Sequence, residues 1–264
     1  MIVARIDPDS TPLSAAQDEA LRPLFFYERK DLLAAYWLVR DRPDGPKLEI
    51  EEPTVLRFLG NLRGRTVLDL GCGDARFGRY ALEQGALCYL GLDGSTEMVG
   101  LAKQVLMGTA GEVNLQDLES WPGDCNRRFD VVVSQLALQY MENIPRLFEV
   151  IRNQLQPHGT FVFSTEHPII TSSYEGENSD GIATSWRVRD YFREGRRVDR
   201  WLNAAVVKQH RTLETYVSEL RRCGFQIDRF SEGRPDITRF VNQTVYERRL
   251  EVPICAIFRC IADS

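Results

Sequence analysis

The chain has 264 residues, of which 43% are hydrophobic and 27% charged, proportions typical of an ordinary globular protein. No apolar run approaches the roughly 20 residues of a membrane span, and residues 1–7 lack the apolar core of a secretory signal, so we expect a cytoplasmic protein without membrane contact. The net charge of −5 disfavours a nucleic-acid partner, because phosphate binding depends on Lys and Arg.

The six cysteines are widely scattered and form no C-x-x-C pair, so we expect reduced thiols and no required metal. They are Cys72, Cys88, Cys125, Cys223, Cys255 and Cys260.

The N-terminal part, residues 1–62, is predicted to be a helical cap. Its first 20 residues are polar and show no sustained period, which is typical of a loose arm. Apolar residues at helical spacing predict a helix over 24–39, a Pro and Gly break follows at 42–46, and a second short helix is expected over 51–62.

The next part, residues 63–166, alternates between apolar strands and helices. Strands are expected at 66–70, 88–93, 112–114, 129–134 and 159–164, and helices at 75–84, 96–106 and 144–156. This alternation predicts an α/β fold with a doubly wound parallel sheet and helices on both faces.

Residues 167–208 interrupt the alternation, being rich in Ser, Gly, Asp and Arg, and we interpret them as an inserted lid after the fifth strand. A helix at 212–223, stopped by Gly224, and strands at 225–230 and 252–261 complete the C-terminal part, residues 209–264. All four parts are expected to form one domain.

A glycine-rich turn follows the first strand. Gly71 and Gly73 let a ligand approach bare backbone, and the next helix directs its free N–H groups at the same place. Dinucleotide-binding folds use a similar turn, so this feature alone leaves the ligand open. Asp69 would repel a pyrophosphate and attract an ammonium by roughly 4 kcal/mol at about 4 Å. Asp93 is placed to accept hydrogen bonds from ribose hydroxyls.

These residues resemble the class I S-adenosylmethionine (SAM)-dependent methyltransferases over roughly residues 55–165. Residues 67–73 match the first motif of that family, Asp93 its ribose-binding acid, and residues 114–118 its adenine-edge segment. The resemblance implies a Rossmann-like, seven-stranded, mostly parallel sheet with one antiparallel strand, for which 252–261 is the candidate.

The resemblance also implies SAM as cofactor, with S-adenosylhomocysteine as product. The glycine loop would surround the methionine part of SAM, and Asp69 would lie near its ammonium group. Asp117 would accept a hydrogen bond from the adenine amino group. Taken alone, Asp93 is also compatible with a helix N-cap and Asp117 with a turn. The expected cofactor-binding residues are Asp69, Gly71, Cys72, Gly73, Asp93, Gly94, Asp117, Leu118, Gln135 and Leu136.

Catalytic candidates follow the fifth strand, where open α/β sheets bind ligands. Glu166 and His167 stand at that strand end, and His210 precedes a later helix, so these three are the expected catalytic residues. A structural hydrogen bond for His167 and a capping or packing role for His210 are the alternatives. The surrounding Glu-His-Pro and Lys-x-His-Arg-Thr strings resemble a bacterial branch of the family, to which no substrate can be attached.

Aromatic residues are expected to line the acceptor pocket, although large aromatics more often pack a core. The candidates are Tyr36, Tyr140, Tyr174 and Trp186. Arginines gathered in the insertion favour an acidic acceptor or RNA, whereas the interleaved Asp190, Glu194 and Asp199 favour a solvated charged hairpin.

The sequence thus predicts methyl transfer from SAM to an O or N atom of a small-molecule acceptor. An RNA-directed methyltransferase and a non-catalytic SAM-binding protein are the alternatives. Asp69, together with Arg76 at the position of the third dinucleotide-loop glycine, argues against an NAD-dependent oxidoreductase. Homodimer formation is left open.

Overall fold

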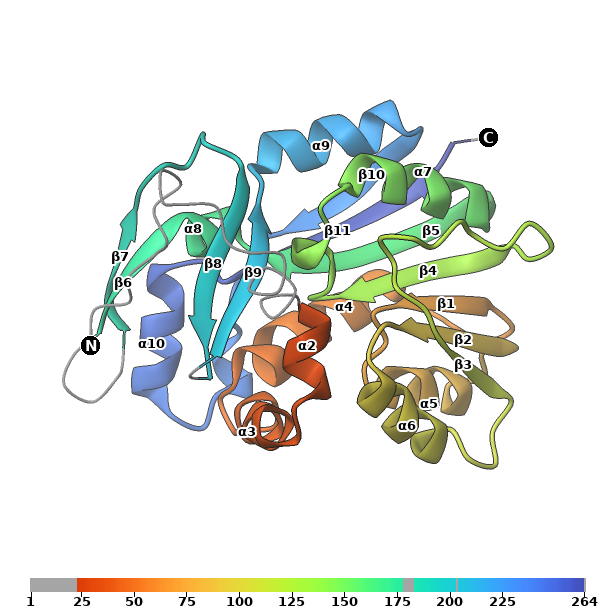
Figure 1. Cartoon of the computed structure of the whole chain (residues 1–264), viewed down its shortest axis with the longest axis horizontal. Helices are drawn as coiled ribbons and strands as arrows, with labels where there is room; N and C mark the ends of the chain where they lie inside the picture. Colours follow the sequence, from red (N-terminus) through yellow and green to blue (C-terminus); the bar gives the residue numbers. More distant parts are fainter. Residues whose placement is uncertain (1–22, 178–182, 203, 264) are drawn as a thin grey trace.

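The computed structural model describes residues 23–177, 183–202 and 204–263, and its centre is a seven-stranded sheet in the order β10-β11-β5-β4-β1-β2-β3 (Figure 1). The strands are β1 (Thr66–Leu70), β2 (Cys88–Asp93), β3 (Gly111–Leu115), β4 (Phe129–Gln135), β5 (Leu155–Glu166), β10 (Phe225–Ser231) and β11 (Cys255–Ala262). Strand β11 is antiparallel to both of its neighbours, and the other pairs are parallel. The mostly parallel sheet with β11 as its antiparallel strand is therefore confirmed.

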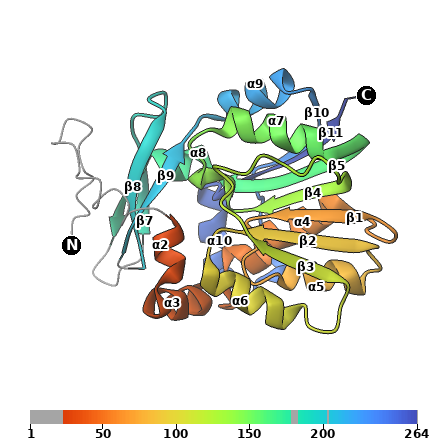
Figure 2. The same ribbon diagram turned by 45° about the vertical axis from the view of Figure 1, so that its right-hand side comes forward.

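Helices cover both faces of this sheet (Figure 2). One face carries α4 (Glu52–Leu59), α5 (Arg76–Glu83) and α6 (Thr96–Val105), and the other carries α7 (Ile144–Gln154) and α9 (Leu213–Arg222). Successive strand residues point to opposite faces, so Val67 joins the apolar cluster of α4, α5 and α6 while Leu68 joins that of α7 and α9. The core consists of these two layers.

The parallel strands end at a common edge. Leu70 of β1 pairs with Leu92 of β2, and Gln135 of β4 pairs with Ser164 of β5. Because loops leave these four strand ends side by side, their polar residues are brought together there. This is the edge at which open α/β sheets bind ligands.

The N-terminal cap differs from the single helix predicted over 24–39. Arg29 has an extended backbone (φ −87°, ψ 113°), which divides the segment into α2 (Pro23–Glu28) and α3 (Lys30–Arg40). A π-helix, η1 (Lys47–Glu51), then leads directly into α4. The predicted N-terminal arm lies outside the described residues.

The insertion contains regular structure that the sequence pattern did not reveal. A short helix, α8 (Pro168–Ser172), precedes two antiparallel hairpins, β6 (Ser173–Glu177) with β7 (Ala183–Val188) and β8 (Gly195–Trp201) with β9 (Ala204–His210). Charged residues occupy both faces of β8, so no apolar alternation marked it as a strand. Helix α10 (Gln243–Glu251) was also unexpected, because it has few apolar residues and buries none.

None of the described helices is long and apolar enough to cross a bilayer.

Candidate active site

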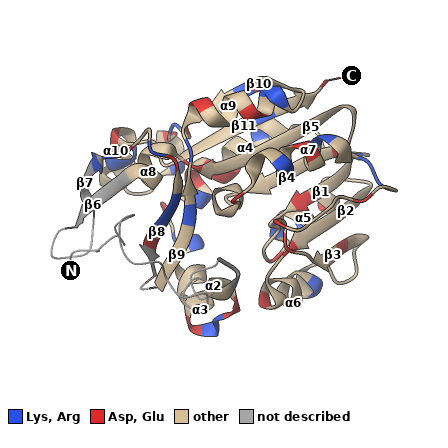
Figure 3. Cartoon of the chain, turned by 45° about the horizontal axis from the view of Figure 1, so that its top comes forward, with Lys and Arg blue, Asp and Glu red and all other residues tan. Residues whose placement is uncertain are grey.

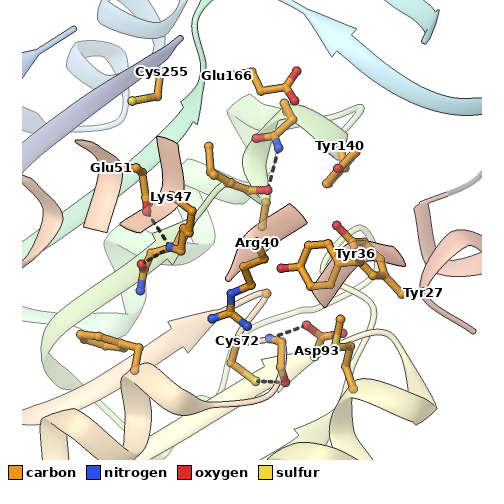
Figure 4. A pocket seen from close by; sticks show the side chains of 18 of the residues that line it. Tyr27, Tyr36, Arg40, Lys47, Glu51, Cys72, Asp93, Tyr140, Glu166 and Cys255 are labelled. Carbon is orange, nitrogen blue, oxygen red and sulfur yellow. Dashed lines mark hydrogen bonds and ion pairs between the residues drawn. The ribbon is translucent and has the colours of Figure 1, made fainter. Parts of the chain in front are cut away.

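A cavity of about 850 Å³ opens at the carboxyl edge of the sheet, between the strand ends and the N-terminal helices. Figure 4 shows its two ends: Cys72 and Asp93 lie at one, and Glu166 at the other, with tyrosines along one side. All ten expected cofactor-binding residues line it, as do Tyr36, Tyr140 and Glu166 of the expected acceptor residues. The topology therefore gathers residues as far apart in the sequence as Tyr36 and Glu166.

The glycine loop forms the floor at the Asp93 end. Gly71 and Gly73 both have positive φ (72° and 56°), a conformation that favours glycine. A Cβ at Gly71 would lie 2.5 Å from Ala137 Cβ, whereas a Cβ at Gly73 would meet no atom within 4 Å. Gly71 is thus required for packing, and Gly73 keeps open space where a ligand can approach.

Asp93 fixes this loop. Its Oδ2 accepts a hydrogen bond from the Gly73 N–H (2.8 Å), and its Oδ1 accepts one from the Ser95 N–H (2.9 Å). Burial raises the pKa of Asp93, and the two backbone donors oppose that shift. Ser95, rather than Asp93, caps α6, through its hydroxyl and the Met98 N–H. Each carboxylate oxygen keeps a lone pair with which ribose hydroxyls could bond.

Asp69 is buried beneath the loop, with 2% of its surface exposed. The Tyr89 hydroxyl donates a hydrogen bond of 2.7 Å to its Oδ2. Burial raises the pKa of Asp69 to about 7, while the Tyr89 hydrogen bond and the positive charge of Lys47 act in the opposite direction. Such a carboxyl would bind an ammonium group most strongly in its ionised form.

The adenine-edge candidates lie beyond Asp93. Asp117 and Leu118 both line the cavity, and Asp117 Oδ1 accepts a hydrogen bond of 3.0 Å from the Glu119 N–H. Asp117 therefore stabilises a turn and also faces the cavity, so the two roles considered for it are compatible.

Two residues of the N-terminal cap that were not predicted, Lys47 and Glu51, hold the end of β4. Lys47 of η1 donates 2.6 Å hydrogen bonds to Gln135 Oε1 and to Glu51 Oε2. Glu51, 1% exposed, also accepts a hydrogen bond from the Ser164 hydroxyl, which in turn accepts one from the Leu136 N–H. Only the i,i+4 spacing of Lys47 and Glu51 was visible in the sequence.

Arg40 of α3 also lines the cavity and was likewise missed. Its Nη1 donates to Asp74 Oδ1 (3.0 Å), and its guanidinium lies 5.1 Å from the centre of the Trp37 ring. Figure 4 places Arg40 between Lys47 and Tyr36, on the Asp93 side of the cavity. A cation there could meet the carboxylate of a bound amino acid.

At the opposite end of the cavity, only one of the two carboxylate oxygens of Glu166 has a partner among the described residues. Lys208 of β9 lies 2.8 Å from Glu166 Oε1 and 2.8 Å from Asp199 Oδ2. Glu166 Oε2 is buried and, among the described residues, has no hydrogen-bond partner. Glu166 lines the cavity, whereas Lys208 does not.

The structure does not bring His167 into the cavity lining. Its Nδ1 accepts a hydrogen bond from the Ile169 N–H (3.1 Å), so the ring proton is on Nε2, 3.1 Å from Glu232 Oε1. Burial lowers the pKa of His167, and Glu232 opposes that shift. Both ring nitrogens are thus engaged in structural hydrogen bonds.

His210 is fully buried behind the cavity wall, with 0% exposure. Its Nε2 lies 2.8 Å from the Tyr191 carbonyl, which can only accept, so Nδ1 accepts from the Thr171 hydroxyl at 2.6 Å. Both ring nitrogens therefore hold the insertion together, and neither is free to act on a methyl acceptor in the cavity.

The backbones of Tyr174 and Trp186 belong to the β6–β7 hairpin, and their side chains lie outside the described part of the structure. Within residues 23–177, 183–202 and 204–263, no cluster of His, Cys, Asp or Glu has the arrangement of a metal site.

Known proteins show the same combination of fold and site. Residues 67–159 match the family model described as a methyltransferase domain. The crystal structure of a SAM-dependent methyltransferase from Mesorhizobium loti is 33% identical and superposes with a TM-score of 0.74 over 82% of this chain and 100% of that chain. An uncharacterized protein of Haemophilus influenzae is 34% identical over 215 residues, 78% of this chain and 85% of that protein.

A more distant relative is the ubiquinone biosynthesis O-methyltransferase of Coxiella burnetii, 27% identical over 123 residues, which cover 45% of this chain and 52% of that enzyme. A doubly wound sheet with a glycine loop and an acid after its second strand defines a nucleoside-binding α/β enzyme. The chain belongs to the class I SAM-dependent methyltransferases, and SAM is its cofactor.

The residues present fit SAM. The open space at Gly73, the lone pairs of Asp93 and the buried Asp69 carboxyl offer surfaces for the methionine part, the ribose and the ammonium, respectively. When bound, SAM supplies an activated methyl group on a sulfonium sulfur.

Proposed function

We propose that the protein transfers the methyl group of SAM to an O or N atom of a small-molecule acceptor. The observation that carries this proposal is the size of the cavity. At about 850 Å³ it is toward the upper end of the roughly 300–1,000 Å³ range of small-molecule pockets, which suits a nucleoside cofactor beside a compact acceptor.

The acceptor would lie at the Glu166 end, with its reacting atom facing the glycine loop. Tyr140 lies toward this end and Tyr36 nearer the loop, so the two rings would help to shield a bound molecule from water, which favours the displacement reaction. Glu166, one of the three expected catalytic residues, lines the cavity there. His167 and His210 would support the insertion rather than touch the acceptor.

An RNA acceptor is supported less well. Figure 3 shows basic residues along β8, but acidic residues lie in this strand and in the segment before it. Glu194 accepts hydrogen bonds from the Thr212 N–H and from the Thr212 and Thr215 hydroxyls, and Asp190 lies within 4 Å of Arg189 and Arg193. This hairpin therefore presents mixed charge rather than a continuous basic surface.

The test supplies SAM with an isotope-labelled methyl group to the protein together with a bacterial extract separated by ultrafiltration into small molecules and macromolecules. Label is expected in the small-molecule fraction, and Asp93→Ala is the control with impaired cofactor binding. Label confined to RNA would support the second candidate, and label in neither fraction would support a non-catalytic SAM-binding protein.

A further inference from the structure

The unpartnered oxygen of Glu166 indicates the kind of molecule that fills the acceptor end. The Glu166 side chain lines the cavity, and its buried Oε2 accepts no hydrogen bond from any described residue. A buried carboxylate oxygen without a donor is unfavourable, so a donor is expected to arrive with the ligand. A molecule offering an N–H or O–H group at that position would complete the site.

The charge balance around Glu166 favours a donor that carries or develops positive charge. Lys208 is shared between Glu166 and Asp199, so this trio has a net charge of −1. Of the cations that line the cavity, Arg40 and Arg76 are paired with Asp74 and Lys47 with Glu51, and Arg196 of β8 is exposed to solvent. The cavity lining as a whole contains nine acidic and five basic side chains. An anionic acceptor would be repelled from this end.

Three tyrosines add a second feature suited to a cation. Tyr27 of α2 and Tyr36 of α3 meet edge to face with ring centres 5.5 Å apart, and Tyr140 of η2 (Leu138–Tyr140) lines the same wall. The charges of Lys208 and Glu166 influence the pKa of Tyr140, whereas those of Arg40 and Asp74 influence the pKa of Tyr36. The tyrosines thus extend along the wall from the loop to Glu166, and aromatic faces attract ammonium groups.

The chemistry of methyl transfer separates amines from hydroxyls at this site. A hydroxyl must lose its proton to a base, and no histidine of the described residues lines the cavity, which leaves carboxylates, bases far weaker than the alkoxide that would form. Burial keeps the tyrosine hydroxyls protonated, because it raises the pKa of Tyr27, Tyr36 and Tyr140. A neutral amine needs no base in the transfer step, since its own lone pair is the nucleophile.

We propose that the acceptor is a primary or secondary amine whose N–H group donates a hydrogen bond to the Glu166 carboxylate. The inference rests on the proposed function. The amine reaches the reactive form by losing a proton to water. Its nitrogen lone pair then forms the N–C bond, the C–S bond breaks, and the sulfur keeps the bonding electrons. The nitrogen becomes a methylated ammonium, and the Glu166 carboxylate stabilises the positive charge that develops there.

The first experiment determines the chemical class of the acceptor. The small-molecule extract is divided by ion exchange at neutral pH into cationic, neutral and anionic fractions, each supplied with protein and methyl-labelled SAM. Label is expected in the cationic fraction. Acetylating the extract and then treating it with hydroxylamine, which restores hydroxyls but leaves amides intact, is expected to abolish labelling.

The second experiment tests Glu166 itself. Glu166→Gln keeps the size of the side chain and removes its charge, and is expected to lower kcat/KM for the cationic fraction on the order of 10²-fold. Asp199 is the other carboxylate that contacts Lys208, and it lies outside the cavity lining. Asp199→Asn is expected to lower kcat/KM less than about fivefold. With S-adenosylhomocysteine bound, so that no methyl group can move, the cationic fraction is expected to raise the Tm of the wild type and not that of Glu166→Gln.

Label in the neutral or anionic fraction, or labelling that survives acetylation, would overturn the amine assignment and leave the proposed function standing. Equal kcat/KM for Glu166→Gln and wild type, or equal Tm shifts, would overturn the role of Glu166. Absence of label from every small-molecule fraction would overturn the proposed function as well.

Discussion

The Tyr89 hydroxyl donates a 2.7 Å hydrogen bond to Asp69 Oδ2, directly beneath the glycine loop. Asp69 belongs to β1 and Tyr89 to the neighbouring strand β2. The Tyr89 hydroxyl also packs closely on Gly91, where an added Cβ would lie 3.1 Å from Tyr89 Oη. The contact links the protonation of a buried carboxyl to the cofactor site, so cofactor affinity is expected to depend on pH.

Cofactor affinity is expected to rise with pH and to level off above about 7. Burial raises the pKa of Asp69 to about 7, so below that pH the ligand-free protein holds this carboxyl protonated. A ligand ammonium favours the ionised form, so binding must then release a proton, and affinity should fall about tenfold per pH unit below the pKa. Calorimetric titration with S-adenosylhomocysteine in buffers of different ionisation enthalpy measures this release.

Tyr89→Phe provides the matched control for that prediction. It keeps the ring and removes the hydroxyl that lowers the pKa of Asp69, so the midpoint of the pH dependence is expected to shift above 7. A flat affinity profile in the wild type, or the same midpoint in both proteins, would show that Asp69 does not titrate at the ligand.

Asp93→Ala is expected to weaken binding of S-adenosylhomocysteine by about 10- to 100-fold, the effect of losing hydrogen bonds to a charged group worth ~1.5–3 kcal/mol. It removes the acceptor for the Gly73 N–H and the oxygens available to a ribose. The measurement is the ligand-induced Tm shift over a range of concentrations. Asp236→Ala, at an exposed helix cap outside the cavity lining, is the control, and equal shifts in the two variants would contradict the role of Asp93.

Lys47→Met is expected to lower the free energy of unfolding by about 3–5 kcal/mol, because it leaves the buried Glu51 carboxylate without its cation. The double variant Lys47→Met, Glu51→Met should recover part of this loss. Urea unfolding measures both. Glu83→Gln interrupts the exposed i,i+4 pair with Arg79 and should cost no more than about 0.5 kcal/mol. A Lys47→Met protein as stable as Glu83→Gln would indicate that Glu51 is neutral or solvated.

His210→Ala is expected to cost about 2–4 kcal/mol of stability, since it leaves the Thr171 hydroxyl and the Tyr191 carbonyl unpaired in a buried place. For His167→Gln and His210→Asn, kcat on an identified acceptor should fall less than tenfold, because neither ring nitrogen faces the cavity. Loss of a general base would instead cost on the order of 10²–10⁴-fold. A loss of that size, together with an altered pH profile, would restore the catalytic interpretation of the histidine concerned.

Much of the cofactor half could be predicted from the sequence because its determinants are local. An apolar strand that ends in glycines at Gly71 and Gly73 specifies both a turn and an exposed backbone, and Asp93 occupies the corresponding end of the next strand. The pattern of strands and helices then fixes which edge of the sheet these residues share. Strand β11 was predictable as a strand, and its antiparallel direction came from the resemblance to a family.

The acceptor half was decided by tertiary structure. Whether Glu166, His167 or His210 faces the cavity depends on how the insertion folds back, and the charged hairpin β8–β9 that controls this has no apolar alternation to reveal it. Lys47 and Arg40 reach the site only because the N-terminal cap packs over the strand ends. The sequence by itself determined the parallel strands and the glycine loop, since these follow from short-range patterns, and it indicated the class of cofactor through its resemblance to a family. Only the fold decided which polar groups form hydrogen bonds and which, such as Glu166 Oε2, are buried without a partner among the described residues.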